Sequence, residues 1–154
     1  MKRLSGPRAA FAAVAISLGV GVPLAWAGGG SPVGRWKTID DDTGEAKAVV
    51  RIWKDGGELK GKIEKLFPKP GADPAPTCTE CDGPRKDKPI IGMTIVWGLE
   101  EDDGEWSGGR ILDPKSGTAY KCKLHLASGG TRLKVRGYVG FSLVGRTQIW
   151  HRKE

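Results

Sequence analysis

The sequence has little of what catalysis or metal binding usually needs. It contains only two histidines, His125 and His151, and neither has an obvious serine or cysteine nucleophile as a partner. The acidic runs at 40–42 and 100–103 lack the register of a calcium-binding loop and are better explained as hairpin turns. The paired glycines at 108–109 and 129–130 predict bulges and turns, not a phosphate-binding loop. We therefore expect no enzyme activity, no cofactor and no metal site.

Two further absences concern the amino terminus. It lacks adjacent arginines, which argues against twin-arginine export, and no cysteine follows its small residues, so nothing suggests a lipid-modified terminus. What is present is a basic start, with Lys2, Arg3 and Arg8, and an apolar run that closes on Ala25-Trp26-Ala27. This pattern is typical of a secretory signal. The run is too short, and too broken by glycine and proline, for a comfortable membrane span of about 20 residues.

The domain organisation follows from this signal. We expect a signal peptide at 1–27, a flexible leader at 28–32 and a single domain at 33–154, in an exported protein that is periplasmic or extracellular and not an integral membrane protein. The signal carries three of the 25 basic residues and none of the 18 acidic ones, so cleavage lowers the formal net charge from +7 to +4. The remaining basic residues are scattered at alternate positions, so we expect no nucleic-acid partner.

The rest of the chain alternates between apolar and polar residues, which is typical of short strands. Turn residues separate the runs, and Asp55-Gly56-Gly57 is a strong hairpin signal. In "ILDPKSGTAY", Asp113 and Pro114 are expected to start a turn in which Gly117 takes a positive φ. The predicted strands lie at 33–39, 46–54, 58–66, 90–98, 105–112, 118–126, 131–138 and 145–152.

One long connection interrupts this pattern. Six prolines lie between residues 67 and 89 and leave few backbone donors for a sheet. Loops of this length are usually functional or need to be tied down. The other connections are short, so we expect an all-β fold, an up-and-down antiparallel barrel of about eight strands, with an open sandwich as the structural alternative.

Several stretches resemble one known family, small exported bacterial proteins called domain of unknown function 2147. They are "VGRWKTIDDDTGEAKAVVRI", "LKGKIEKL", "CTECDGPRKDKPIIGM", "WSGGRILDPKSGTAYKCKL" and "LKVRGYVGFSLVGRTQIWHR". The resemblance spans about residues 33–152. It implies a calycin-like or lipocalin-like β-barrel and no assigned activity. In lipocalin-like proteins a tryptophan on the first strand, here in Gly34-x-Trp36, closes one barrel end with an arginine packed across it, and Arg146 and Arg152 are the candidates.

The cysteines allow several pairings. An exported chain meets an oxidising compartment, so a disulfide is expected. We slightly favour Cys78 with Cys81, because Cys122 lies on the inward face of its strand, where a small apolar residue is comfortable; either of the first two with Cys122 is the alternative. A zinc site shared with His125 would need a bulge, since residues three apart on a strand face opposite ways. Redox catalysis is disfavoured, since the pair lies in a proline-rich loop beside Glu80 and Asp82.

An aromatic and polar set supplies the candidate ligand site. In "GRTQIWHR", Arg146, Gln148 and Trp150 share one face, and Thr147, Ile149 and His151 share the other. If the first face points inward, the barrel interior suits an amphipathic or anionic ligand. If the second face points inward, Arg146 is a surface residue and the core is ordinary. The simpler interpretation, which we favour, is that Trp36 and Arg146 only cap the barrel end. The candidate ligand-binding residues are Trp36, Trp106, Tyr120, Arg136, Tyr138, Arg146, Gln148 and Trp150.

Three functions are compatible with these features. The first is a non-enzymatic barrel that binds a small apolar or amphipathic ligand, with the 67–89 loop as a lid. The second is a structural or interaction module of the cell envelope, with a packed interior and a protein partner on basic outer faces such as those of Lys60, Lys62, Lys121 and Lys123. The third is a cysteine-based metal or redox protein, which requires free thiols close to a further ligand.

Overall fold

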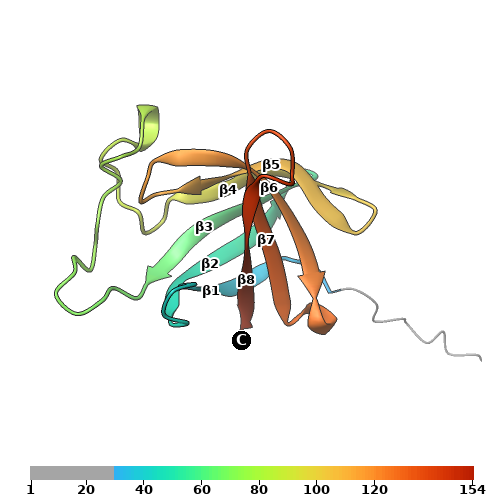
Figure 1. Cartoon of the computed structure of the whole chain (residues 1–154), viewed down its shortest axis with the longest axis horizontal. Coiled ribbons are helices and arrows are strands. Elements are labelled where there is room, and N and C mark those ends of the chain that lie inside the picture. Colours follow the sequence, from blue (N-terminus) through green and yellow to red (C-terminus); the bar gives the residue numbers. More distant parts are fainter. Residues whose placement is uncertain (1–29) are drawn as a thin grey trace, which may run out of the picture.

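The computed structural model describes residues 30–154, so the expected signal peptide and the start of the leader lie outside the described residues (Figure 1). Eight antiparallel strands follow one another around a closed barrel, and the last pairs with the first. Their bounds are β1 (Gly34–Ile39), β2 (Ala46–Asp55), β3 (Glu58–Leu66), β4 (Thr94–Asp102), β5 (Glu105–Asp113), β6 (Thr118–Ala127), β7 (Arg132–Tyr138) and β8 (Gly145–Lys153). Two short 3₁₀ turns, Gly83–Arg85 and Ser128–Gly130, complete the described elements. The predicted up-and-down barrel is confirmed.

The strands form where they do because alternation and turn chemistry agree locally. In β3, Leu59, Gly61 and Ile63 are buried while the lysines between them are half-buried, as a period of two requires. The predicted turn after β5 is also present: the Lys115 amide donates to Asp113 Oδ1, and Gly117 has φ +69°. Gly108 has φ +80° beside a register shift in the β5–β6 pair, which confirms the expected bulge.

The fourth strand differs from its predicted range of 90–98. Its pairing begins at Thr94 and continues to Asp102. Gly92 has φ +90° and the Met93 amide donates to the Ile90 carbonyl, so residues 90–93 form a turn despite their apolar character. The apolar run reflects burial of Met93 at the barrel wall, and an unbroken apolar run does not reveal where pairing starts.

The topology gives the barrel two different ends. The start of β1 and the β2–β3, β4–β5 and β6–β7 turns form one end, which we call the closed end. The β1–β2, β3–β4, β5–β6 and β7–β8 connections form the other, the open end. Toward the closed end the interior is filled by fully buried side chains, including Trp36, Leu59, Leu99, Leu124 and Leu133.

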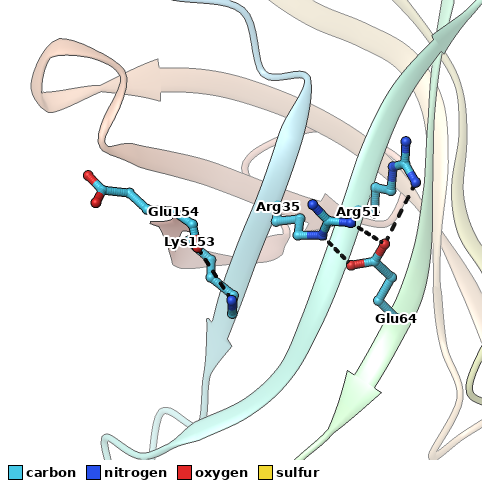
Figure 2. A network of polar contacts seen from close by, with 5 residues as sticks. All are labelled: Arg35, Arg51, Glu64, Lys153 and Glu154. Carbon is cyan, nitrogen blue, oxygen red and sulfur yellow. Dashed lines mark hydrogen bonds and ion pairs between the residues drawn. The ribbon is translucent and has the colours of Figure 1, made fainter.

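The outer face carries charged pairs. Glu64 on β3 accepts from Arg35 on β1, with Arg35 Nε 2.6 Å from Glu64 Oε2, and Arg51 on β2 lies 3.8 Å from Glu64 Oε1 (Figure 2). The hydrogen bond with Arg35 is the main cause of a lowered pKa for Glu64. Three neighbouring strands are thus linked on the solvent side.

Candidate functional site: a cavity at the open end of the barrel

The open end contains a cavity of about 720 Å³. This volume lies in the range of small-molecule pockets, roughly 300–1,000 Å³. Apolar side chains form most of its wall, and polar and charged groups lie among them. The apolar members include Ala48, Val50, Ile63, Leu66, Ile90, Ile95, Ile111, Leu112, Val135 and Trp150; the polar and charged ones include Thr38, Lys47, Thr77, Thr79, Lys115, Tyr120, Tyr138, Arg146 and Gln148.

Trp150 and Gln148 bring β8 into the cavity. Trp150 is almost fully buried, and its Nε1 donates to Gln148 Oε1 at 3.2 Å. Both side chains line the cavity, whereas Thr147 and His151 on the other face of the strand are exposed. The inward alternative therefore describes Gln148 and Trp150, whereas the Arg146 side chain is 67% exposed. A buried indole whose N–H is paired leaves an apolar ring as part of the wall.

Arg146 lies at the rim of this cavity. Its Nη2 donates to Asp41 in the β1–β2 turn, and this hydrogen bond is the main cause of a raised pKa for Arg146. The pairing of Arg146 with Trp36, one of the sequence interpretations, is wrong. The start of β8 and the start of β1 lie at opposite ends of the barrel, because neighbouring strands are antiparallel.

Arg152 is the arginine that packs on Trp36. The Arg152 guanidinium carbon lies 4.2 Å from the centroid of the Trp36 ring, and Trp36 Nε1 donates to the Pro32 carbonyl at 2.8 Å. These groups close the end of the barrel opposite the cavity. Trp36 is therefore a structural plug, as the lipocalin-like resemblance implied.

The long β3–β4 connection contributes one side of the cavity. Pro76, Thr77, Thr79 and Ile90 all line it. The loop pairs with itself through a bridge between Thr77 and Pro89, and Cys78 and Cys81 form the expected disulfide with an S–S distance of 2.03 Å. Both sulfurs are thus occupied, and both residues are buried.

This loop contacts the barrel at three places. Cys78 Sγ lies 3.2 Å from the Pro114 carbonyl oxygen, and the Glu80 carbonyl lies so close to Gly117 that a side chain there would overlap it. Arg85 stacks on Trp97, with 4.4 Å between the guanidinium carbon and the ring centroid. Figure 1 shows the loop, in yellow-green, beside the β5–β6 hairpin. The disulfide therefore shapes a wall segment that is docked on the β5–β6 turn.

Cys122 is separate from this site. It is fully buried on β6, and burial raises the pKa of its thiol to about 12. His125 on the same strand is exposed, so the two side chains face opposite ways as predicted. Among residues 30–154, no group of three or more histidine, cysteine or acidic side chains is placed to hold a metal ion.

The eight candidate ligand residues separate into two groups. Five line the cavity: Tyr120, Tyr138, Arg146, Gln148 and Trp150. The other three lie elsewhere. Trp36 closes the opposite end; Trp106, near the β4–β5 turn, packs under Lys54 with 5.2 Å from Nζ to the ring centroid; Arg136 donates to Ser142 O and Thr147 Oγ1.

Sequence reasoning missed two parts of the site. The apolar wall residues Ala48, Val50 and Val135 look like ordinary core positions, and no local signal separates a cavity wall from packed core. The β7–β8 loop, 139–144, exposes four apolar side chains beside the cavity. A signal for it was present, because "VGFSLV" has apolar side chains at four of its six positions, with glycine and serine at the other two, and contains no charge.

Comparison with known proteins agrees with this architecture. The family model described as an uncharacterized protein conserved in bacteria, DUF2147, matches residues 34–152. The chain belongs to the DUF2147 family. The match covers all eight strands of this DUF2147 protein except the last residue of β8. A search of curated proteins found no match.

A solved structure supports the fold of the DUF2147 protein. The DUF2147 protein is similar to the solved structure of protein HP1028 from the human pathogen Helicobacter pylori, which is described as belonging to the lipocalin family. The TM-score is 0.69 at 16% sequence identity, and the match covers 80% of this chain and 84% of that one. At this identity the likeness shows a lipocalin-like fold. Within residues 30–154, no helix is long and apolar enough to cross a membrane.

Proposed function

We propose that this DUF2147 protein is an exported, non-catalytic barrel that binds one small apolar or amphipathic molecule in the cavity at its open end. The observation that carries the proposal is the cavity of about 720 Å³, whose wall is mostly apolar and whose lining also includes polar and charged side chains. Such a distribution suits a ligand with an apolar body inside and a polar head near solvent. The lining holds three basic residues, Lys47, Lys115 and Arg146, against one acidic residue, Asp113, so an anionic head is the better fit.

The other two hypotheses account less well for these observations. A packed interaction module needs no ligand-sized cavity, whereas the open half of this barrel holds one. A cysteine-based metal or redox site needs free thiols, whereas Cys78 and Cys81 are bonded to each other and Cys122 lies in the core. The disulfide is compatible with export into an oxidising compartment.

The first test is native mass spectrometry of the mature protein released gently from its own compartment, compared with its denatured mass. We expect a displaceable extra mass and a polypeptide that lacks two hydrogens. In parallel, the purified protein should take up cis-parinaric acid, a fluorescent fatty acid. A protein that carries no extra mass and takes up no probe would overturn the proposal.

A matched pair of variants locates the binding. Ile111 lines the cavity, and Ile111→Trp should fill part of it and weaken probe uptake. Lys134 on β7 is exposed and does not line the cavity, so Lys134→Trp adds the same side chain outside the barrel and should leave uptake unchanged. Equal uptake by both variants, with both folded by circular dichroism, would place the probe elsewhere.

A further inference from the structure

The β7–β8 loop exposes a group of apolar side chains to solvent. Val139 is 62% exposed, Phe141 83%, Leu143 90% and Val144 65%. The other exposed large apolar residues among those described, Val33 and Ile91, are only 40% and 41% exposed. Single exposed apolar residues are normal, but four within six residues mark an interaction surface. We call residues 139–144 the apolar tip.

The apolar tip is held in this exposed position by its own hydrogen bonds. The Val139 amide donates to Val144 O at 2.9 Å, and the Val144 amide donates to Phe141 O at 3.0 Å. Arg136 Nε donates to Ser142 O at 2.6 Å, and Lys121 Nζ to Gly140 O at 3.3 Å. Figure 1 shows the loop standing out beyond the strands, in red. The fold thus presents Phe141 and Leu143 to solvent instead of folding them over the cavity.

The side chains that hold the apolar tip in place are positively charged. The loop itself contains no charged residue, and the two side chains that bind its carbonyls, Arg136 and Lys121, are both cations. Arg146 follows the loop after Gly145, but it pairs with Asp41 and also lies near Asp42 and Asp113, so its charge is not counted here. Apolar side chains at a tip with cations at its base are the combination by which proteins bind the interface of anionic bilayers.

A bilayer fits the apolar tip better than a protein partner does. A stable protein interface buries about 800 Å² on each side, which a six-residue protruding tip does not offer. The apolar tip is also continuous with the cavity, because Val139 and Val144 line its wall. An apolar surface therefore runs from Phe141 and Leu143 into the barrel.

We propose that the apolar tip docks this protein on anionic phospholipid bilayers, by inserting Phe141 and Leu143 between headgroups while Lys121 and Arg136 face the lipid charge. Docking in this way turns the mouth of the cavity toward the membrane. The further step, exchange of an amphipathic ligand between bilayer and cavity, rests on the proposed function above. The docking itself does not depend on it.

Vesicle flotation with the mature protein tests the docking. The protein should float with vesicles of equal parts phosphatidylcholine and phosphatidylglycerol, float less with phosphatidylcholine alone, and lose binding as salt is raised. Phe141→Ser with Leu143→Ser should lower the partition coefficient by about tenfold to a hundredfold. Val33→Ser, an exposed apolar position at the closed end, is the control and should float like the wild type.

The outcomes separate docking from ligand binding. The double variant should keep its thermal midpoint and its uptake of cis-parinaric acid in vesicle-free buffer, because both side chains are exposed. Loop-dependent flotation by a protein that takes up no probe would retain docking and overturn only the proposed function. Docking would be overturned if the wild type floats with neither kind of vesicle, or if the double variant floats as well as the wild type. It would also be overturned if the wild type is a dimer that does not float and the two substitutions convert it to a monomer, because the apolar tip would then be a dimer interface.

Discussion

The guanidinium of Arg152 lies across the indole of Trp36, with its carbon 4.2 Å from the ring centroid. Its three nitrogens donate to three backbone carbonyls: Nε to Gly130 at 2.7 Å, Nη1 to Val33 at 3.1 Å and Nη2 to Ser31 at 2.8 Å. One side chain from the last strand therefore joins the amino-terminal segment, the β6–β7 turn and the plug of the barrel. Arginine suits this position because its planar fork can stack and donate at once.

We expect Arg152→Gln to lower the free energy of unfolding by about 2 to 3 kcal/mol, through loss of the charged hydrogen bonds and the cation–π contact. Arg152→Lys should restore only part of it, because an ammonium cannot reach three carbonyls in one plane. Urea denaturation measures both. Lys134→Gln on the exposed face of β7 is the control, and a loss no larger than the control's would contradict a capping role.

The docking of the long loop on the β5–β6 turn can be tested at two glycines with nearly the same backbone conformation. Gly117 has φ +69° and Gly44 has φ +73°, but only at Gly117 would a side chain overlap the Glu80 carbonyl; at Gly44 it would meet nothing within 4 Å. Gly44→Ala should cost about 1 kcal/mol from its positive φ. Gly117→Ala should cost about 1 to 3 kcal/mol more.

Hydrogen exchange identifies where that additional loss arises. In Gly117→Ala the amides of residues 77–90 should exchange faster than in Gly44→Ala, since the loop must move away from the turn. Equal exchange in the two variants would show that Gly117 matters only for its own turn.

The number of reactive thiols should differ between the native, the denatured and the denatured and reduced protein. The native protein should not react with Ellman's reagent, because the Cys78–Cys81 pair is oxidised and burial raises the Cys122 thiol pKa to about 12. Denaturation should reveal one thiol, and denaturation with reduction three. Two or more reactive thiols in the denatured, unreduced protein would contradict the disulfide.

Removal of the disulfide should act mainly on the loop. For Cys78→Ser with Cys81→Ser, the short cross-linked segment predicts a loss of about 2 kcal/mol on the chain-entropy account. Exchange should increase over residues 77–90, while the amides of β2 and β3 keep their protection. A uniform loss of protection over the whole barrel would show that the disulfide supports the global fold.

The pH dependence of stability should report on Glu64. The Arg35 hydrogen bond lowers the folded-state pKa of Glu64, so its contribution is present above the ordinary carboxyl pKa of 4.5 and is lost as pH falls through the lowered value. Glu64→Gln should therefore be slightly less stable than the wild type at pH 7, with the difference shrinking in acid. The effect is small because the pair lies on the surface. Urea midpoints of the wild type and Glu64→Gln at pH 7 and in acid measure this effect. A stability difference between the two proteins that does not change with pH would contradict the prediction.

Local rules determined much of this fold from the sequence. Strand β3 was predicted with its observed bounds, and the turn at Asp113 and Gly117 with its conformation, because alternation and turn chemistry depend on neighbours in the chain. The Cys78–Cys81 pair was favoured for a similar reason, since alternation placed Cys122 in the core. The two-residue period of a strand also placed Gln148 and Trp150 on one face of β8, although only the structure showed that this face points inward.

The tertiary structure alone decided which residues meet. Trp36 pairs with Arg152, and not with Arg146, because β1 and β8 run antiparallel with Trp36 opposite Arg152 in register. The division of the interior into a packed half and a cavity also has no local signal, since Leu124 and Val135 belong to the same apolar pattern. The sequence by itself determined strands, turns and their facing, which short-range sterics and hydrogen bonding control. Closure of the barrel decided the cap, the cavity and the exposure of the apolar tip, because these depend on contacts between segments distant in the chain.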